Sequence, residues 1–178
     1  MTNPPETPID HAPGDDAETQ RATFLALLER FDDAMLVTHQ EDGSIHARPM
    51  RIARIGAGGD LWFVTASDTQ KVEEIENTMR CAVTMQRDRA FLGMSGLAEI
   101  VTDAALVREL WQPAWRVWFP EGPTSANLCL VHVVPDRAEY WDNSGWKGLK
   151  FLLASAIAAL RGRAPDDAGP ALHGRVEL

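Results

Sequence analysis

The feature that most limits the possible folds is a series of strand-like segments joined by very short turns. Residues 34–40, 45–55 and 61–67 are rich in β-branched and aromatic side chains, and Asp42–Gly43 and Gly58–Gly59 lie between them. Asp-Gly and Gly-rich turns between such segments are typical of β-hairpins. Because a parallel strand pair needs a long crossover, these short connections favour an antiparallel sheet.

The rest of the chain continues this pattern with a few helices inserted. Apolar periodicity and turn residues predict helices over 23–31, 68–79, 103–111 and 145–162, and strands over 80–86, 90–101, 127–135 and 137–143. Gly93 and Gly96 predict a bend or bulge in the strand that contains them. There is no alternation of strand and helix, so we expect a mainly β fold with α (α+β), an antiparallel barrel with peripheral helices.

We expect one domain over residues 21–162, preceded by a flexible segment over 1–20 and followed by a loose tail over 163–178. The first segment lacks the basic and apolar regions of a signal peptide. The longest apolar run, residues 151–160, is too short to span a bilayer, so we expect a cytoplasmic protein without a membrane partner. A net charge of −9 disfavours nucleic-acid binding.

Two basic residues indicate an anion site. His46 and Arg48 share one face of the strand predicted over 45–55, because side chains alternate along a strand. Lys71 lies in the first turn of a predicted helix, where a cation opposes the helix dipole. A phosphate bound there by Arg48, Lys71 and backbone N–H groups, with the hydroxyls of Ser67 and Thr69 as further donors, would reverse that argument. The simpler alternative is that each basic side chain is merely solvated.

Other polar and aromatic residues are less specific. Trp111, Trp115 and Trp118 either pack in a core or dimer interface, or form a wall for a flat ligand. The histidines and cysteines lack metal-binding spacing, so we predict no metal site. Glu73 and Glu74 are predicted to lie on the solvent-exposed face of their helix. No catalytic acid or base can be assigned.

Five segments occur in a characteristic order: MLVTHQEDGSIHARPM, DLWFVTASDTQKVEEIEN, SGLAEIV, ELWQPAWRVWFPEGP and VHVVPDRAEYWD. Together they resemble the FMN-binding split-barrel superfamily, the pyridoxamine 5′-phosphate oxidase-like group, and within it the general stress protein branch. The match covers roughly Phe24 to Leu160. It implies an antiparallel split β-barrel that forms a homodimer, with FMN at the subunit interface.

The resemblance also implies roles for particular residues. Arg48 and Lys71 would bind the FMN phosphate, and Thr69 would replace the serine of the family's Ser-x-Lys pattern. The remaining implied cofactor-binding residues are Pro49, Met50, Trp62, Phe63, Val64 and Thr65, with Trp111, Tyr140 and Trp141 contributed by the other subunit.

The implied function is a flavin-dependent oxidoreductase of the general stress protein type, acting on an unknown small molecule with NAD(P)H as a candidate electron donor. A non-catalytic protein that binds or sequesters FMN is the alternative. Relatives that bind deazaflavin or haem are a third possibility. Pyridoxamine 5′-phosphate oxidation itself is disfavoured, because residues 139–151 lack the arginine and histidine that such oxidases place there.

Overall fold

The computed structural model describes residues 17–40, 42–142 and 172–178. Its strands are β1 (Asp33–His39), β2 (Ile45–Ile55), β3 (Leu61–Ala66), β4 (Arg80–Arg87), β5 (Ala90–Val101), β6 (Leu128–Asp142) and β7 (Leu172–Glu177). Its helices are α1 (Ala17–Leu28), α2 (Gln70–Thr78) and α3 (Ala104–Leu110), with short 3₁₀ segments η1 (Pro113–Val117) and η2 (Gly122–Thr124).

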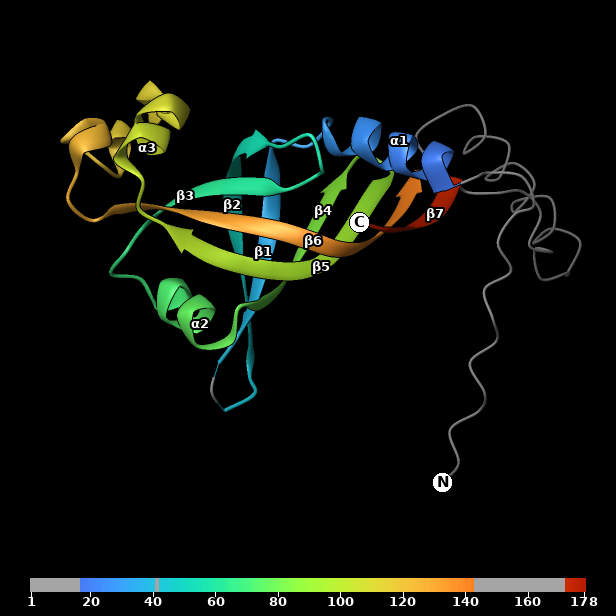
Figure 1. The fold of residues 1–178 in the computed structure, drawn as a ribbon, viewed down its shortest axis with the longest axis horizontal. Coiled ribbons are helices and arrows are strands. Elements are labelled where there is room, and N and C mark those ends of the chain that lie inside the picture. The colour runs from blue at the N-terminus through green and yellow to red at the C-terminus, as the bar shows by residue number, and fades with distance from the viewer. Residues whose placement is uncertain (1–16, 41, 143–171) are drawn as a thin grey trace, which may run out of the picture.

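The strands form an antiparallel sheet in the order β3-β2-β1-β4-β5-β6-β7, and an additional pairing of β3 with β6 closes a barrel from β1 to β6. Figure 1 shows α1 and α2 on opposite sides of this barrel and α3 at one end. The prediction of an antiparallel barrel with peripheral helices is therefore confirmed. Among the described residues, no helix has the length and apolar character that crossing a bilayer requires.

Two apolar clusters hold these elements together. The larger one fills the barrel with alternate side chains of the strands, including the fully buried Leu36, Phe63 and Val83, and α1 adds Phe24 and Leu28. The smaller cluster lies beneath α3 and η1 and consists of Val107, Leu110, Trp115, Phe119, Leu128 and Leu130. Burial of these side chains is the main force that fixes α3 and η1 against the barrel end.

One strand corrects the sequence prediction. Residues 127–135 and 137–143 were expected as two strands, yet β6 is one strand of 15 residues that runs through Pro135. The pairing of β5 with β6 shifts register at Ser95/Gly96, opposite Pro135. A Cβ on Gly96 would lie only 2.2 Å from the carbonyl oxygen of Val134. An irregularity therefore occurs at Gly96, but the extra residue, Asp136, lies in β6 and not in the strand where the bulge was predicted. This bulge accommodates the proline within a continuous strand.

The barrel opens along half of β2. Residues 45–51 of β2 pair with β1. Strand β3 pairs with β2 only at residues 52–55, whereas it pairs with β6 along its whole length. The backbone N–H of Ile52 donates to Asp32 across the β1–β2 ladder, so alternation turns the nitrogen of Pro49 toward the other edge. No described strand pairs with that edge, and the proline therefore removes no ladder hydrogen bond.

The terminal predictions have mixed outcomes. The loose tail predicted over 163–178 is wrong for β7, which pairs with residues 137–142 of β6. Helix α1 begins at Ala17, within the segment predicted to be flexible. The helix predicted over 145–162 lies outside the described residues, as do residues 1–16.

Candidate functional site

A cavity of about 460 Å³ lies beside the open edge of β2. Its lining comprises Pro49, Met50 and Arg51 of β2, Val64, Thr65 and Ala66 of β3, Thr69, Lys71, Trp115, Trp118, Phe119 and Asn127. The volume falls in the range of about 300–1,000 Å³ that is usual for small-molecule sites. Because its walls are largely apolar and aromatic, this ring cavity, as we call it, suits a flat ligand.

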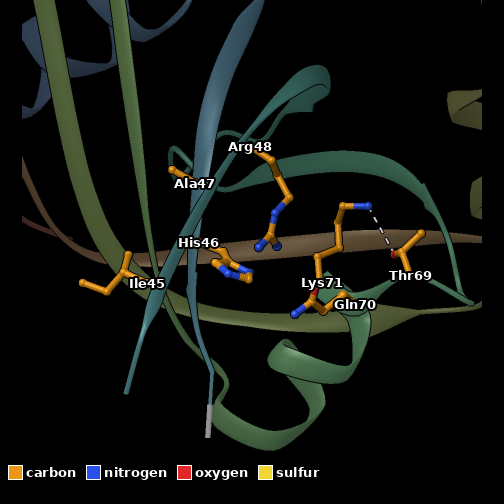
Figure 2. Close-up of a pocket in the computed structure, with 7 residues that line it drawn as sticks. All are labelled: Ile45, His46, Ala47, Arg48, Thr69, Gln70 and Lys71. Atoms are coloured by element: carbon orange, nitrogen blue, oxygen red, sulfur yellow. Dashed lines mark hydrogen bonds between the residues drawn. The ribbon is translucent and has the colours of Figure 1, made fainter. Parts of the chain in front are cut away.

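A second cavity of about 320 Å³ is lined by Ile45, His46, Ala47, Arg48, Thr69, Gln70 and Lys71. Figure 2 shows the Arg48 guanidinium and the His46 ring on β2, facing the N-terminal turn of α2. Thr69 and Lys71 line both cavities, so this cationic cavity adjoins the ring cavity. Together they form a site with an apolar part and a positively charged part.

Lys71 is fixed at the junction by two hydroxyl groups. Its Nζ donates to Thr65 Oγ1 at 2.9 Å. The same Nζ donates to Thr69 Oγ1 at 3.2 Å, as Figure 2 shows. Burial lowers the pKa of Lys71, and the nearby charge of Arg48 lowers the pKa further. Both effects disfavour the ammonium form, and an anion bound between the two cations would oppose them.

Arg48 carries the clearest sign of a ligand. Its Nη2 donates to Glu74 Oε2 at 2.8 Å, whereas its Nη1 is buried and has no hydrogen-bond partner among the described residues. A buried donor without an acceptor is costly, and such groups are rare in folded proteins. A phosphate oxygen in the cationic cavity would supply the missing acceptor, so the residues present fit a phosphorylated ligand.

Glu74 corrects a second prediction. It was expected on the solvent-exposed face of α2 together with Glu73, but Glu74 is only 5% exposed while Glu73 is exposed. Burial alone would raise the pKa of the Glu74 carboxyl, yet hydrogen bonds from Thr38, Arg48 and Gln40 outweigh that effect and lower the pKa to about 2. Glu74 is therefore ionised at neutral pH.

Position along α2 could have revealed this burial. Glu74 lies between Val72 and Ile75, which both face the barrel, and it follows Lys71 by three residues. On a helix, residues three or four apart lie on the same face. The buried face of α2 thus includes position 74.

Some of the residues predicted to bind the cofactor line one of the two cavities, and others do not. Pro49, Met50, Val64, Thr65, Thr69 and Lys71 line the ring cavity, and Arg48 lines the cationic cavity. Phe63 is fully buried inside the barrel, and the ring of Trp62 stacks on His132 with 3.8 Å between centroids. Neither of these two aromatic residues is among the described residues that line the ring cavity or the cationic cavity.

The residues expected from a second subunit are also placed. Trp111 packs edge-on against Trp115, with ring centroids 5.8 Å apart, and Trp141 stacks on His173. Tyr140 is 2% exposed in the barrel core, so it offers almost no surface to another subunit. None of the three belongs to the lining that the structure describes for the ring cavity or the cationic cavity.

Several lining residues were missed or left undecided by the sequence. Trp115 and Trp118 were assigned either to packing or to a ligand wall, and both line the ring cavity. Trp115 also belongs to the smaller apolar cluster, so it serves both purposes. Arg51, Phe119 and Asn127 were not predicted, because no local pattern marks the side chains that long-range pairing brings to a cavity.

An antiparallel barrel that opens at one strand, with an apolar cavity beside a cationic one, is the architecture of a split-barrel protein. The chain belongs to the family described as pyridoxamine 5′-phosphate oxidase like, whose sequence profile matches residues 19–166. The resemblance inferred from the sequence is thereby confirmed.

Solved structures agree with this assignment. The general stress FMN/FAD binding protein of Xanthomonas citri is 30% identical, with a TM-score of 0.61 over 72% of this chain and 92% of that protein. A general stress protein 26 from Jannaschia sp. CCS1 is 24% identical, and it has a TM-score of 0.67 over 88% of this chain and 97% of its own. The latter similarity supports the fold alone.

A curated relative, protein bli-3 of Neurospora crassa, is 26% identical over 117 residues. The match covers 60% of this chain and 56% of the relative. The chain therefore spans little more than half the length of that protein.

Proposed function

We propose that the chain binds FMN, with the phosphate in the cationic cavity and the flavin ring in the ring cavity. The observation that carries this proposal is the buried, unpartnered Nη1 of Arg48, which lies near the charge of Lys71. Membership of the family and the name of the Xanthomonas citri relative support a flavin as the ligand. Bound FMN would supply the electron- and hydride-transfer chemistry.

We further propose that the protein is an FMN-dependent oxidoreductase acting on a small molecule. Among the described residues that line the ring cavity, only Arg51 and Lys71 carry ionisable side chains. Arg51 pairs with Asp33 at 3.0 Å, and Lys71 donates to two threonines. Without a carboxylate or imidazole in that lining, these residues bind and orient a ring, which suits hydride transfer better than side-chain acid–base catalysis.

A second copy of the chain is expected to complete the site. Val117 and Trp118 are 74% and 69% exposed, and Trp118 lines the ring cavity. Large exposed apolar side chains at a ligand site are typical of surfaces that another subunit covers. These exposures support a homodimer with FMN at the subunit interface.

The phosphate assignment is tested by titrating FMN into wild-type protein and two variants. Arg48→Ala and Lys71→Ala should each weaken binding roughly tenfold or more, because each removes a charge-assisted hydrogen bond of about 1.5–3 kcal/mol. Arg80→Ala is the matched control, since Arg80 is exposed and pairs with Asp136 outside both cavities. Unchanged affinity in both site variants would contradict the phosphate site.

Three further measurements test the other parts of the proposal. Purified protein that neither carries nor takes up FMN, judged from its visible spectrum, would exclude the cofactor. Anaerobic mixing of the FMN-loaded protein with NADH or NADPH should bleach the flavin at catalytic rates, whereas slow or absent bleaching would favour the non-catalytic FMN-binding alternative. Light scattering should give a dimer, and a monomer with full flavin occupancy would contradict a two-subunit site.

A further inference from the structure

Arg48, which lines the cationic cavity, is paired with a buried charge that the proposed function does not explain. Glu74 is buried against the β1–β2 hairpin, and its Oε2 lies 2.8 Å from Nη2 of Arg48. A carboxylate that stays ionised near a phosphate site should repel the ligand. Some other contribution to binding would offset this repulsion.

The contacts of Glu74 show how it is fixed. Thr38 of β1 donates its hydroxyl hydrogen to Oε2 at 2.5 Å, and Gln40 donates through Nε2 to Oε1 at 3.3 Å. The Nδ1 atom of His46 lies 3.0 Å from the same Oε1. Three residues of the β1–β2 hairpin thus hold the carboxylate in one orientation, and the fourth contact is with Arg48.

The planar geometry of the Arg48 guanidinium determines the direction of Nη1. A guanidinium is planar and rigid, so fixing the direction of Nη2 largely fixes the direction of Nη1. In Arg48, Nη2 is held by Glu74 and Nη1 is the buried donor without a partner. The long arginine side chain would otherwise lose much rotational freedom when the ligand binds.

We propose that Glu74 is a positioning residue that holds one edge of the Arg48 guanidinium and thereby presents Nη1 to the phosphate of the ligand. The proposal rests on the proposed FMN site. It assigns Glu74 a role in ligand recognition through Arg48, without direct contact between the carboxylate and the ligand. Pre-ordering of this kind strengthens binding because less freedom is lost on association.

A purely electrostatic role for Glu74 predicts the opposite effect on phosphate binding. If Glu74 acted only through its charge, it would reduce the net positive charge that Arg48 and Lys71 present, and it would weaken phosphate binding. If Glu74 only stabilised the packing of α2 on the hairpin, its loss would affect every ligand of the site equally. The three roles are separated by measuring the contribution of the phosphate alone.

The experiment compares the dissociation constants of FMN and riboflavin, which lacks the phosphate, through quenching of flavin fluorescence. Their ratio, riboflavin over FMN, should exceed about ten in the wild type. Glu74→Asp keeps the charge but draws the carboxylate away from Arg48, so the ratio should fall at least about fivefold. Glu74→Gln keeps the length and an acceptor oxygen, so the ratio should stay within about twofold of the wild type or rise.

Two controls make the reading specific. Glu73→Asp makes the same substitution at an exposed carboxylate on the same helix and should leave the ratio unchanged. In an Arg48→Ala background, Glu74→Asp should cause no further loss, because Glu74 acts through Arg48. Thermal unfolding of each variant establishes that it is folded at the assay temperature.

Each alternative result overturns the inference. If Glu74→Asp leaves the ratio unchanged, Glu74 does not position Arg48. This holds whether or not the variant binds FMN and riboflavin equally more weakly. A ratio that rises in Glu74→Asp means that the carboxylate only competes with the phosphate. If the wild-type ratio is near one, there is no phosphate site, and the proposed function fails as well. If the wild-type ratio is high and falls in Arg48→Ala but not in Glu74→Asp, only the role of Glu74 is refuted.

Discussion

Acid should destabilise this protein partly through the carboxylate of Glu74. The pKa of this group falls from the ordinary 4.5 to about 2 in the folded chain, because the hydrogen bonds from Thr38, Arg48 and Gln40 exceed the opposing effect of burial. A lowered pKa means that the folded state favours the ionised form more than the unfolded state does. The resulting stabilisation is complete above pH 4.5 and is lost as the pH falls through about 2.

The size of the effect follows from the shift. Each pKa unit corresponds to about 1.4 kcal/mol, so Glu74 should contribute roughly 3 kcal/mol to the free energy of unfolding at neutral pH. This is a substantial fraction of the roughly 5–15 kcal/mol that stabilises a typical domain. Between pH 4.5 and 2 the contribution of Glu74 should disappear.

Urea unfolding, followed by tryptophan fluorescence at several pH values between 7 and 2, measures this directly. Glu74→Gln should be less stable than the wild type at pH 7, and the difference should shrink as the pH falls, because the wild type loses the same charge by protonation. Glu73→Gln is the control, since Glu73 is an exposed neighbour on the same helix. Parallel pH profiles for the wild type and Glu74→Gln would refute the reasoning.

Two other features of the fold give direct tests. Gly96→Ala should lower stability by roughly 1–3 kcal/mol or more in thermal unfolding, because the new Cβ would lie 2.2 Å from the Val134 carbonyl oxygen. Gly93→Ala, with no atom within 4 Å of its Cβ, should have little effect, and equal losses would contradict the close approach at Gly96. Burial raises the pKa of the Cys81 and Cys129 thiols to about 11, so neither should react with a disulfide reagent at pH 8 until urea unfolds the chain. Rapid modification of the folded protein would show that these thiols are accessible.

Local patterns were sufficient where neighbouring residues determine the structure. The Asp42–Gly43 turn joins β1 to β2 as predicted, and Gly43 has a positive φ of 82°, which glycine adopts without strain. Asp103 caps α3 by accepting hydrogen bonds from the backbone N–H groups of Ala105 and Leu106. Such signals depend on a few adjacent residues and are visible in one sequence.

Features that depend on long-range strand pairing could not be predicted from local sequence patterns. Pro135 was taken as a strand end, because the bulge that accommodates it is formed with a strand almost forty residues earlier in the chain. Strand β7 was missed because its stability comes from pairing with β6 rather than from its own composition. Glu74 was assigned to solvent because the groups that make its burial tolerable, Thr38 and Arg48, come from two other elements.

For the candidate site, the sequence indicated Arg48 and Lys71 as a cationic pair, and the structure places both in the lining of one cavity. The resemblance also drew attention to the strand that contains Trp62 and Phe63, but it could not determine which side of the strand faces the cavity. Strand alternation and the closure of the barrel decide that, since Phe63 fills the core. Their relation to a ligand held between two subunits stays a prediction.

The open edge of β2 has a consequence for the behaviour of the protein in solution. An unpaired strand edge is a template to which a strand of another molecule can add, and this leads to aggregation. Pro49 interrupts the row of N–H donors along this edge, and the charged Arg51 lies two residues further along β2. Replacing Pro49 would therefore restore a continuous row of donors and make edge-to-edge association between molecules easier.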